Sequence, residues 1–243
     1  MSFVTFGSVL APGASGRLGA ALLPPVLDSG GPVLSAAVFV RGELLLQAFQ
    51  LREEYEDPAA VLAGLPEVAR SEERIAPFLA ESADASAGLA KTLRGRLMRR
   101  VQQRVVNAVP AALSAIHYPV RAGAADALTQ IFTAVRPETR PMLRDDRGGT
   151  SGALHGVAVF VVGRHMVRVV AYDGDVADVA RYMAHRPGRP AIEERLSPYL
   201  EEYGDTATPE GFMAVFAERS MERLALSSPA PPVVAGEPAA ELL

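Results

Sequence analysis

A histidine and an arginine interrupt an apolar stretch in the second half of the chain. His165 and Arg168 stand in HMVRVVAY, whose other residues predict a buried strand. A buried arginine needs an anion or a carboxylate as its partner. Arg168 therefore either forms a structural ion pair or lines a pocket that holds an oxyanion; the candidate carboxylates for the ion pair are Asp173, Glu193 and Glu194. Because side chains alternate along a strand, His165 and Arg168 are expected on opposite faces, not in one pocket.

The other histidines offer less specific chemistry. His117 and Tyr118 lie in a predicted strand that ends before Arg121. A histidine in a strand is either a satisfied core residue or a group that moves a proton. His155, at the start of a strand, is expected to be solvated, and His185, between two helices, is expected to cap the first. No two histidines have the i, i+4 spacing of metal ligands and the chain has no cysteine, so no metal site is predicted.

These residues lie in the second copy of an internal repeat. Shifting the chain by 121 positions places residues 37–84 on residues 158–205 without a gap, with 16 identities in 48 positions. AVFVRGELLLQ then lies on AVFVVGRHMVR, and EERIAPFL lies on EERLSPYL. A chain of 243 residues with this offset predicts two copies of one unit rather than one large domain.

Apolar periodicity and turn residues predict the elements of one unit. In the second copy these are a strand at 113–120, a helix at 124–135, a loop at 136–152, a strand hairpin at 157–162 and 165–171, a helix from the cap Asp175 to Ala184, a helix at 191–200 and a last strand at 211–217. This order is the split β-α-β pattern of ferredoxin-like domains. The first unit shows the same order in residues 3–108.

The central strands indicate how the two units pack. Residues 36–40 and 157–161 are apolar on both faces, whereas a sheet covered on one face alternates apolar and polar residues. We therefore expect an α+β fold with two tandem ferredoxin-like domains, at 1–108 and 109–224, whose sheets pack face to face as a pseudo-dimeric α+β barrel. Residues 225–243 are rich in proline and alanine and are expected to form a flexible tail.

The composition argues against several functional classes. A hydrophobic share of 49% and a charged share of 21% are typical of a globular chain. The net charge of −4 gives no electrostatic support for nucleic-acid binding. No apolar run approaches the roughly 20 residues of a membrane helix, and no signal peptide is recognisable. We expect a cytoplasmic protein that contacts neither membrane nor nucleic acid.

The run from Gly13 to Gly19 has glycine spacing similar to that of a nucleotide-binding loop between strand and helix. The acidic residue expected at the end of the next strand is absent, and the second copy keeps only Gly123. An ordinary turn is therefore expected here.

The chain also contains a charged motif that recurs in both units and a run of arginines between them. Glu193, Glu194 and Arg195 repeat Glu72, Glu73 and Arg74, and a feature kept in both copies is expected to be structural. Between the units lies a basic run that forms either a solvated helix face or a dock for an acidic partner, made of Arg94, Arg96, Arg99, Arg100 and Arg104.

A family resemblance rests on short motifs. Pro187 followed by ERLSPYL at 194–200, after a strand hairpin and the acidic turn 173–175, resembles the tetracenomycin-type aromatic polyketide cyclases, which have a proline and then Glu-Arg-Val-x-x-Tyr-Leu at the same spacing. Val120-Arg121 with Ala125-Asp126-Ala127 resembles the first strand-to-helix turn of that family. The tandem arrangement over roughly residues 3–224 looks like the SchA/CurD-like proteins of actinobacterial spore-pigment and aromatic polyketide clusters.

The resemblance implies a pocket between sheet and helices and work on a poly-β-ketone or its aromatic product. In the cyclases, a histidine and arginines near the pocket are held to assist aldol closure. Here the histidine position of the third strand holds Arg168, the arginine position before the second strand holds Val157, and the arginine that ends the first strand corresponds to Arg121. Related ferredoxin-like proteins include cofactor-independent monooxygenases that oxidise phenols to quinones.

We therefore expect an aromatic polyketide tailoring enzyme, a cyclase that works by enolisation, aldol attack and loss of water. Its site is placed in the second unit, which has Arg168, His165 and Tyr172 where the first has Gln47, Leu44 and Leu51. The candidate catalytic residues are Arg168, His117, Arg121, His165 and Tyr172. The candidate substrate-binding residues are Met166, Tyr118, Phe160, Tyr199 and Arg195.

No cofactor is expected for this activity. A cofactor-independent monooxygenase and a non-catalytic scaffold protein are the alternatives. The expected ligand is an aromatic polyketide or a poly-β-ketone. An acyl carrier protein, other polyketide synthase enzymes and a second copy of the chain are the further partners considered.

Overall fold

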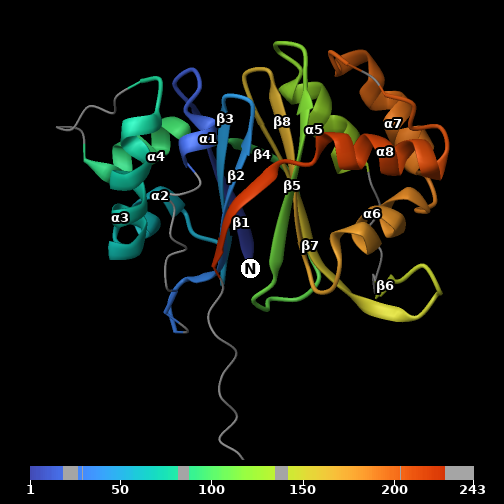
Figure 1. The fold of residues 1–243 in the computed structure, drawn as a ribbon, viewed down its shortest axis with the longest axis horizontal. Helices are drawn as coiled ribbons and strands as arrows, with labels where there is room; N and C mark the ends of the chain where they lie inside the picture. The colour runs from blue at the N-terminus through green and yellow to red at the C-terminus, as the bar shows by residue number, and fades with distance from the viewer. Residues whose placement is uncertain (19–26, 29, 82–87, 135–141, 203, 228–243) are drawn as a thin grey trace, which may run out of the picture.

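Two antiparallel sheets stand side by side at the centre of the molecule, and each carries helices on the side turned away from the other sheet (Figure 1). The computed structural model describes residues 1–18, 27–28, 30–81, 88–134, 142–202 and 204–227. Helices α1–α4 cover the first sheet, and α5–α8 cover the second (Figure 1).

The first sheet has the strand order β1-β3-β2-β9. Its strands are β1 (Ser2–Val9), β2 (Val33–Arg41), β3 (Leu44–Leu51) and β9 (Glu222–Ser227). Its helices are α1 (Ser15–Leu18), α2 (Pro58–Ala63), α3 (Pro66–Ile75), the 3-10 turn η1 (Ala76–Phe78) and α4 (Leu89–Arg96).

The second sheet has the order β4-β7-β8-β5, and the short β6 pairs with β7. Read from β5 to β4, this order corresponds strand by strand to β1-β3-β2-β9 of the first sheet. Its strands are β4 (Arg99–Val105), β5 (Ala112–Pro119), β6 (Met142–Arg144), β7 (Thr150–Val162) and β8 (His165–Tyr172). Its helices are α5 (Ala125–Thr133), α6 (Val176–Ala184), α7 (Arg189–Leu196), the 3-10 turn η3 (Ser197–Tyr199) and α8 (Pro209–Arg219). No helix in the described part of the chain is long and apolar enough to cross a membrane.

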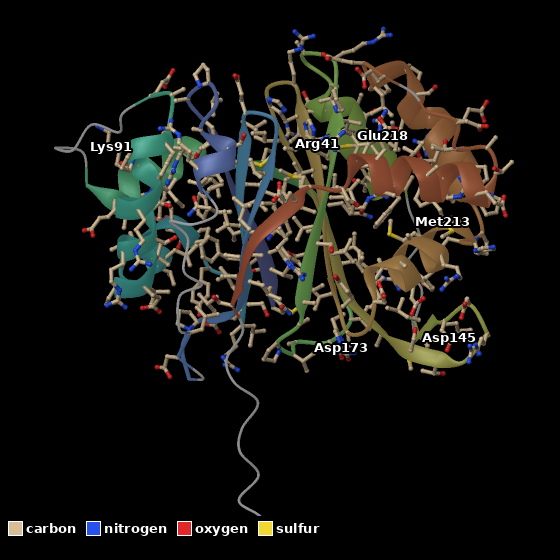
Figure 2. The ribbon with its side chains drawn as sticks, viewed as in Figure 1. Arg41, Lys91, Asp145, Asp173, Met213 and Glu218 are labelled. Atoms are coloured by element: carbon tan, nitrogen blue, oxygen red, sulfur yellow. The ribbon has the colours of Figure 1, made fainter. Side chains whose placement is uncertain are left out.

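The two halves exchange their last strands. β4 follows the first half but pairs with β7 of the second sheet, and β9 follows the second half but pairs with β2 of the first. Single bridges also join the sheets at both edges, between Phe6 and Leu97 and between Ile116 and Ser220. Arg41, which ends β2, donates a hydrogen bond to the backbone carbonyl of Glu218 in α8 (Figure 2). Separating the halves would therefore break a strand ladder in each sheet.

The inner faces of the sheets form one apolar core. Phe39 and Leu46 of the first sheet belong to the same cluster as Phe160, Val167 and Val169 of the second. Each of these side chains is at most 1% exposed. Burying one such side chain stabilises a fold by roughly 1.5–3 kcal/mol, so this layer contributes strongly to holding the halves together.

Most predicted elements are present, but the end of the chain differs. The segment 211–217 is not the predicted strand: it lies within α8, which begins where the Thr208 hydroxyl accepts the Gly211 N–H at 3.0 Å, with Pro209 next in sequence. The last strand is β9, so residues 225–227 belong to a sheet and not to a tail. Residues 228–243 lie outside the described part.

Two further segments differ from their predictions. The predicted loop 136–152 contains β6 and the start of β7. The basic run is not one helix face, because α4 ends at Arg96 and β4 begins at Arg99. Four of its arginines pair with carboxylates of the chain: Arg94 with Asp57, Arg96 with Glu72, Arg99 with Asp126, and Arg100 with Glu54. In the glycine-rich run, Ala14 and Leu18 are buried, and Gly19 lies outside the described residues.

Candidate functional site

A cavity of about 370 Å³ lies between the outer face of the second sheet and its helices. The sheet side comes from β4, β7 and β8, and the opposite wall from α5–α8. The lining residues are Val101, Gln102, Gln103, Arg104, Phe132, Thr133, Leu154, Val157, Arg168, Met183, Arg186, Pro187, Arg189, Ile192, Glu193 and Phe212. Because β4 comes from the first half of the chain, both halves build this cavity.

Arg168 lies in the cavity wall and is 7% exposed. Its guanidinium stands over the rings of Tyr118 and Phe132, with the central carbon 5.7 and 5.8 Å from the ring centroids. It makes no hydrogen bond or salt bridge to any residue in the described ranges, so the ion pair considered from the sequence is not formed. A cation–π contact contributes about 0.5–2 kcal/mol, whereas desolvating a charge costs several kcal/mol. An anionic ligand would offset that cost.

Glu193 is the acidic residue of the cavity wall. It projects from α7, is 3% exposed and has no hydrogen-bond or salt-bridge partner among the described residues. Burial raises the pKa of its carboxyl group, although the charges of Arg168, Arg189 and Arg219 act to lower it. The environment thus favours the protonated form of this carboxyl more than water does.

The other two arginines near Glu193 are held by backbone carbonyls. Arg189 Nε donates to the carbonyl of Ala184 at 2.9 Å, and its guanidinium stands over the Phe212 ring at 5.0 Å. Arg219 donates to the carbonyl of Glu202 at 2.7 Å. These bonds fix both side chains, so Arg168 is the one of these three described arginines that donates no hydrogen bond to the protein.

The equivalent place in the first half is almost closed. A hollow of only about 20 Å³ is lined there by Ala36, Gln47, Val68 and Ser71, which correspond in the repeat to Val157, Arg168, Arg189 and Ile192. Gln47 Nε2 donates to Glu72 Oε1 at 2.7 Å, and Glu72 also pairs with Arg96. Equivalent elements therefore surround a hydrogen-bonded polar cluster in the first half and an open cavity in the second.

Two of the four histidines, His117 and His165, lie away from this cavity. His117 Nε2 and His165 Nδ1 are 3.0 Å apart on the inner face of the second sheet, so the predicted separation of His165 from Arg168 is confirmed. Burial, and secondarily the charge of His165, lowers the pKa of His117 to about 4; burial also lowers the pKa of His165. His165 lines a separate hollow of about 760 Å³, which lies beside β1 and α4.

The remaining two histidines form hydrogen bonds within the protein. His155 was expected to be solvated, but it is 5% exposed because Nε2 pairs with Asp173 at 2.7 Å and Nδ1 contacts Asn107 at 3.3 Å. His185 ends α6, and its Nδ1 lies 2.9 Å from the carbonyl of Arg181, which confirms the predicted cap. In the described part of the chain, no three His, Asp or Glu side chains could hold a metal ion.

The other sequence candidates occupy different places. Tyr118 lies under Arg168. Met166 and Tyr172 are buried on the cavity side of the sheet without lining the cavity, and the Tyr172 hydroxyl bonds to that of Ser114 at 3.1 Å. Tyr199 is half-buried against the same core, whereas Phe160 belongs to the inner core between the sheets. Arg121 and Arg195 are exposed outside the cavity lining.

Sequence reasoning missed two parts of the cavity. The recurrence of Glu193 as Glu72 predicts a structural role for both residues. Within the described residues, however, Glu72 forms hydrogen bonds and Glu193 does not. The sequence does contain a sign of this pairing: both copies have a polar residue at the two equivalent positions, Gln47 and Glu72 in the first and Arg168 and Glu193 in the second. The wall from β4 could not have been placed, because no local pattern shows into which sheet a last strand inserts.

Comparison with known proteins places the second half in a family. Residues 111–228 match the family model described as the SchA/CurD like domain. The chain is 29% identical over 107 residues to "Polyketide synthase CurD" of Streptomyces cyaneus, covering 44% of this chain and 28% of that protein. It is 27% identical over 145 residues to "Protein SchA" of Streptomyces halstedii, covering 59% and 35%. A "42.8 kDa protein in whiE locus" of Streptomyces coelicolor is 36% identical over 64 residues, 26% of this chain and 16% of that one.

The chain thus spans about a third or less of the length of these curated relatives. Among solved structures, it is similar to a putative monooxygenase from Lactobacillus acidophilus, with a TM-score of 0.47, 7% identity and coverage of 94% of this chain and 97% of that chain. An anthrone oxidase-like protein gives a TM-score of 0.38 at 12% identity, with coverage of 97% and 95%. The family match contains α5–α8 and Arg168, and residues 111–228 are accordingly a SchA/CurD-like domain.

Proposed function

We propose that the chain is an aromatic polyketide tailoring enzyme, a cyclase whose site is the cavity of the second half. The observation that carries this is Arg168, a buried guanidinium with no hydrogen-bond partner among the described residues, in a cavity of about 370 Å³. The equivalent residue of the first half, Gln47, donates a hydrogen bond to Glu72, and the hollow beside it measures only about 20 Å³. The similarity to a protein called a polyketide synthase supports the substrate class.

The cavity suits an extended, partly apolar substrate with carbonyl oxygens. Val157, Ile192 and Phe212 provide apolar walls, and Arg168 provides N–H donors. In a poly-β-ketone, removal of a proton from a CH2 between two carbonyls gives an enolate, which attacks a third carbonyl and then loses water. Arg168 would donate hydrogen bonds to the enolate oxygen, whose negative charge grows as the proton leaves. Tyr118 and Phe132 would hold its guanidinium in place.

The proposal also gives a role to the first unit of the tandem fold. We infer that the two units act as a pseudo-dimeric α+β barrel in which the first unit is the structural partner. The exchanged strands β4 and β9 and the bridges at both sheet edges support this inference. An acyl carrier protein or another polyketide synthase enzyme would supply the substrate.

The test is incubation of the protein with a reactive poly-β-ketone, with mass spectrometry of the products and an oxygen electrode. A cyclised product that has lost water, formed without oxygen uptake and lost in an Arg168→Ala variant, is the expected result. Oxygen uptake with a quinone product would replace the cyclase by a cofactor-independent monooxygenase. Binding of aromatic ligands without turnover would favour the scaffold role.

A further inference from the structure

The proposed cyclase needs a group that moves a proton, and the paired histidines His117 and His165 lie on the face of the sheet opposite to the cavity. His117 and His165 bond to one another on the inner face, whereas Arg168 lies on the outer face. Among the described cavity-lining residues, the carboxylate is Glu193 on α7. Its neighbour Glu194 is exposed and does not line the cavity.

The repeat provides an internal comparison for Glu193. Glu72 occupies the equivalent position, and its two carboxylate oxygens bond to Gln47 and Arg96. Glu193 has neither bond among the described residues. This is so although Arg168 stands on β8 where Gln47 stands on β3, and Arg219 ends α8 as Arg96 ends α4. A carboxylate needed only for stability would be expected to form these bonds, because a buried acceptor without a partner destabilises the fold.

We infer that Glu193 is the catalytic base of the enolisation step, and this inference rests on the proposed function. The Glu193 carboxylate takes a proton from a CH2 between two carbonyls, and the C–H electron pair becomes the enolate held by Arg168. The enolate carbon then forms a bond to a ketone carbon of the same chain, whose oxygen becomes an alkoxide. That alkoxide takes the proton back from the Glu193 carboxyl group, which leaves an aldol and restores the carboxylate.

The surroundings of Glu193 suit this cycle. Burial raises the pKa of its carboxyl group, and a carboxylate with a raised pKa is a stronger base. The positive charges of Arg168, Arg189 and Arg219 limit the rise, so that the ionised form remains accessible. The rate of proton removal should therefore increase with pH as Glu193 ionises.

Hydrogen–deuterium exchange isolates this step from ring closure. The probe is ethyl benzoylacetate, whose CH2 lies between two carbonyls, and exchange of that CH2 in D2O is followed by NMR above the buffer rate. Binding is measured separately by calorimetry. We expect Glu193→Gln to lower the enzymatic exchange rate at least 100-fold while the Kd changes less than threefold, and to remove its rise with pH.

Two control variants accompany this measurement. Glu194→Gln changes an exposed neighbour on the same helix, and Glu72→Gln changes the equivalent residue of the first half. Both are expected to keep the exchange rate of the unaltered protein. Exchange that persists within threefold in Glu193→Gln but is lost in Arg168→Gln would overturn the role of Glu193 and leave the proposed function standing. Absence of both binding and exchange in the unaltered protein would count against the proposed function itself.

Discussion

Arg168 and Gln47 occupy equivalent positions on β8 and β3, but within the described residues only Gln47 has a hydrogen-bond partner in the protein. Gln47 donates to Glu72 at 2.7 Å, and the hollow beside it measures about 20 Å³. Arg168 stands over two aromatic rings beside a cavity of about 370 Å³. Equivalent positions of the two halves thus differ: one holds a closed polar cluster and the other faces an open cavity.

Replacing Arg168 by the residue of the first half tests whether this difference is functional. We expect Arg168→Gln to lower kcat by about 10²–10³-fold, the usual effect of losing one donor to a developing oxyanion. The thermal unfolding temperature should not fall, because the cost of desolvating the Arg168 charge exceeds the contribution of its cation–π contacts to Tyr118 and Phe132. Arg121→Gln, at an exposed arginine outside the cavity, serves as the matched control. Full activity in Arg168→Gln would refute the assignment.

Filling the cavity should abolish binding without disturbing the fold. Ile192 is half-buried in the cavity wall, and its counterpart Ser71 lines the closed hollow. We expect Ile192→Phe to weaken binding of an aromatic β-keto ester at least tenfold, measured by calorimetry, because the larger ring occupies ligand space. Ile192→Val, which leaves the cavity open, should bind normally; equal affinity of both variants would show that ligands bind elsewhere.

Glu193 and Glu72 should respond oppositely to the same change. A carboxyl group with a raised pKa destabilises the fold when ionised, and this cost appears as pH rises through its folded-state pKa. Glu193→Gln is therefore expected to maintain or raise the free energy of unfolding at pH 8. Glu72→Gln should lower it by about 1–3 kcal/mol, because Arg96 loses its charged partner. Urea unfolding of the two variants measures both values, and a loss of stability in Glu193→Gln would indicate a structural role.

The histidine pair should make the fold sensitive to acid. The folded-state pKa of His117 is about 4, below its ordinary value of 6.5, so the unfolded chain takes up this proton first. Stability from this residue is fully present above pH 6.5 and is lost as pH falls towards 4, by at most about 3 kcal/mol. Urea unfolding between pH 4 and 7 should show a shallower decline in His117→Gln. His185→Gln, at an exposed helix end, should follow the unaltered protein, and an unchanged slope in His117→Gln would contradict the expectation.

Residues 111–228, expressed without the rest of the chain, should not form the complete cavity. Residues 111–228 lack β4, which pairs with β7 and supplies Gln102, Gln103 and Arg104 to the cavity. They would also expose the inner face around Phe160. We expect this fragment to aggregate or self-associate on size-exclusion chromatography with light scattering, and to bind ligand only when residues 1–110 are added as a second chain. A monomeric fragment that binds alone would refute this.

The sequence by itself determined the repeat, several strands and the faces on which their side chains lie. The offset of 121 residues predicted the repeat, and apolar runs predicted β5, β7 and β8. Alternation along β8 placed His165 and Arg168 on opposite faces, and the helix break placed His185 as a cap. These features depend on neighbours within a few positions, where the backbone geometry of a strand or a helix leaves little choice.

The tertiary structure decided which groups meet. It inserted β4 and β9 into the opposite sheets, buried His155 against Asp173, and left Arg168 and Glu193 facing one cavity without a bond. Each outcome joins residues that are far apart along the chain or depends on the space that packing leaves between layers. Residue type and spacing set the polarity of a position, whereas burial, partner and open volume arise only when sheets and helices pack together.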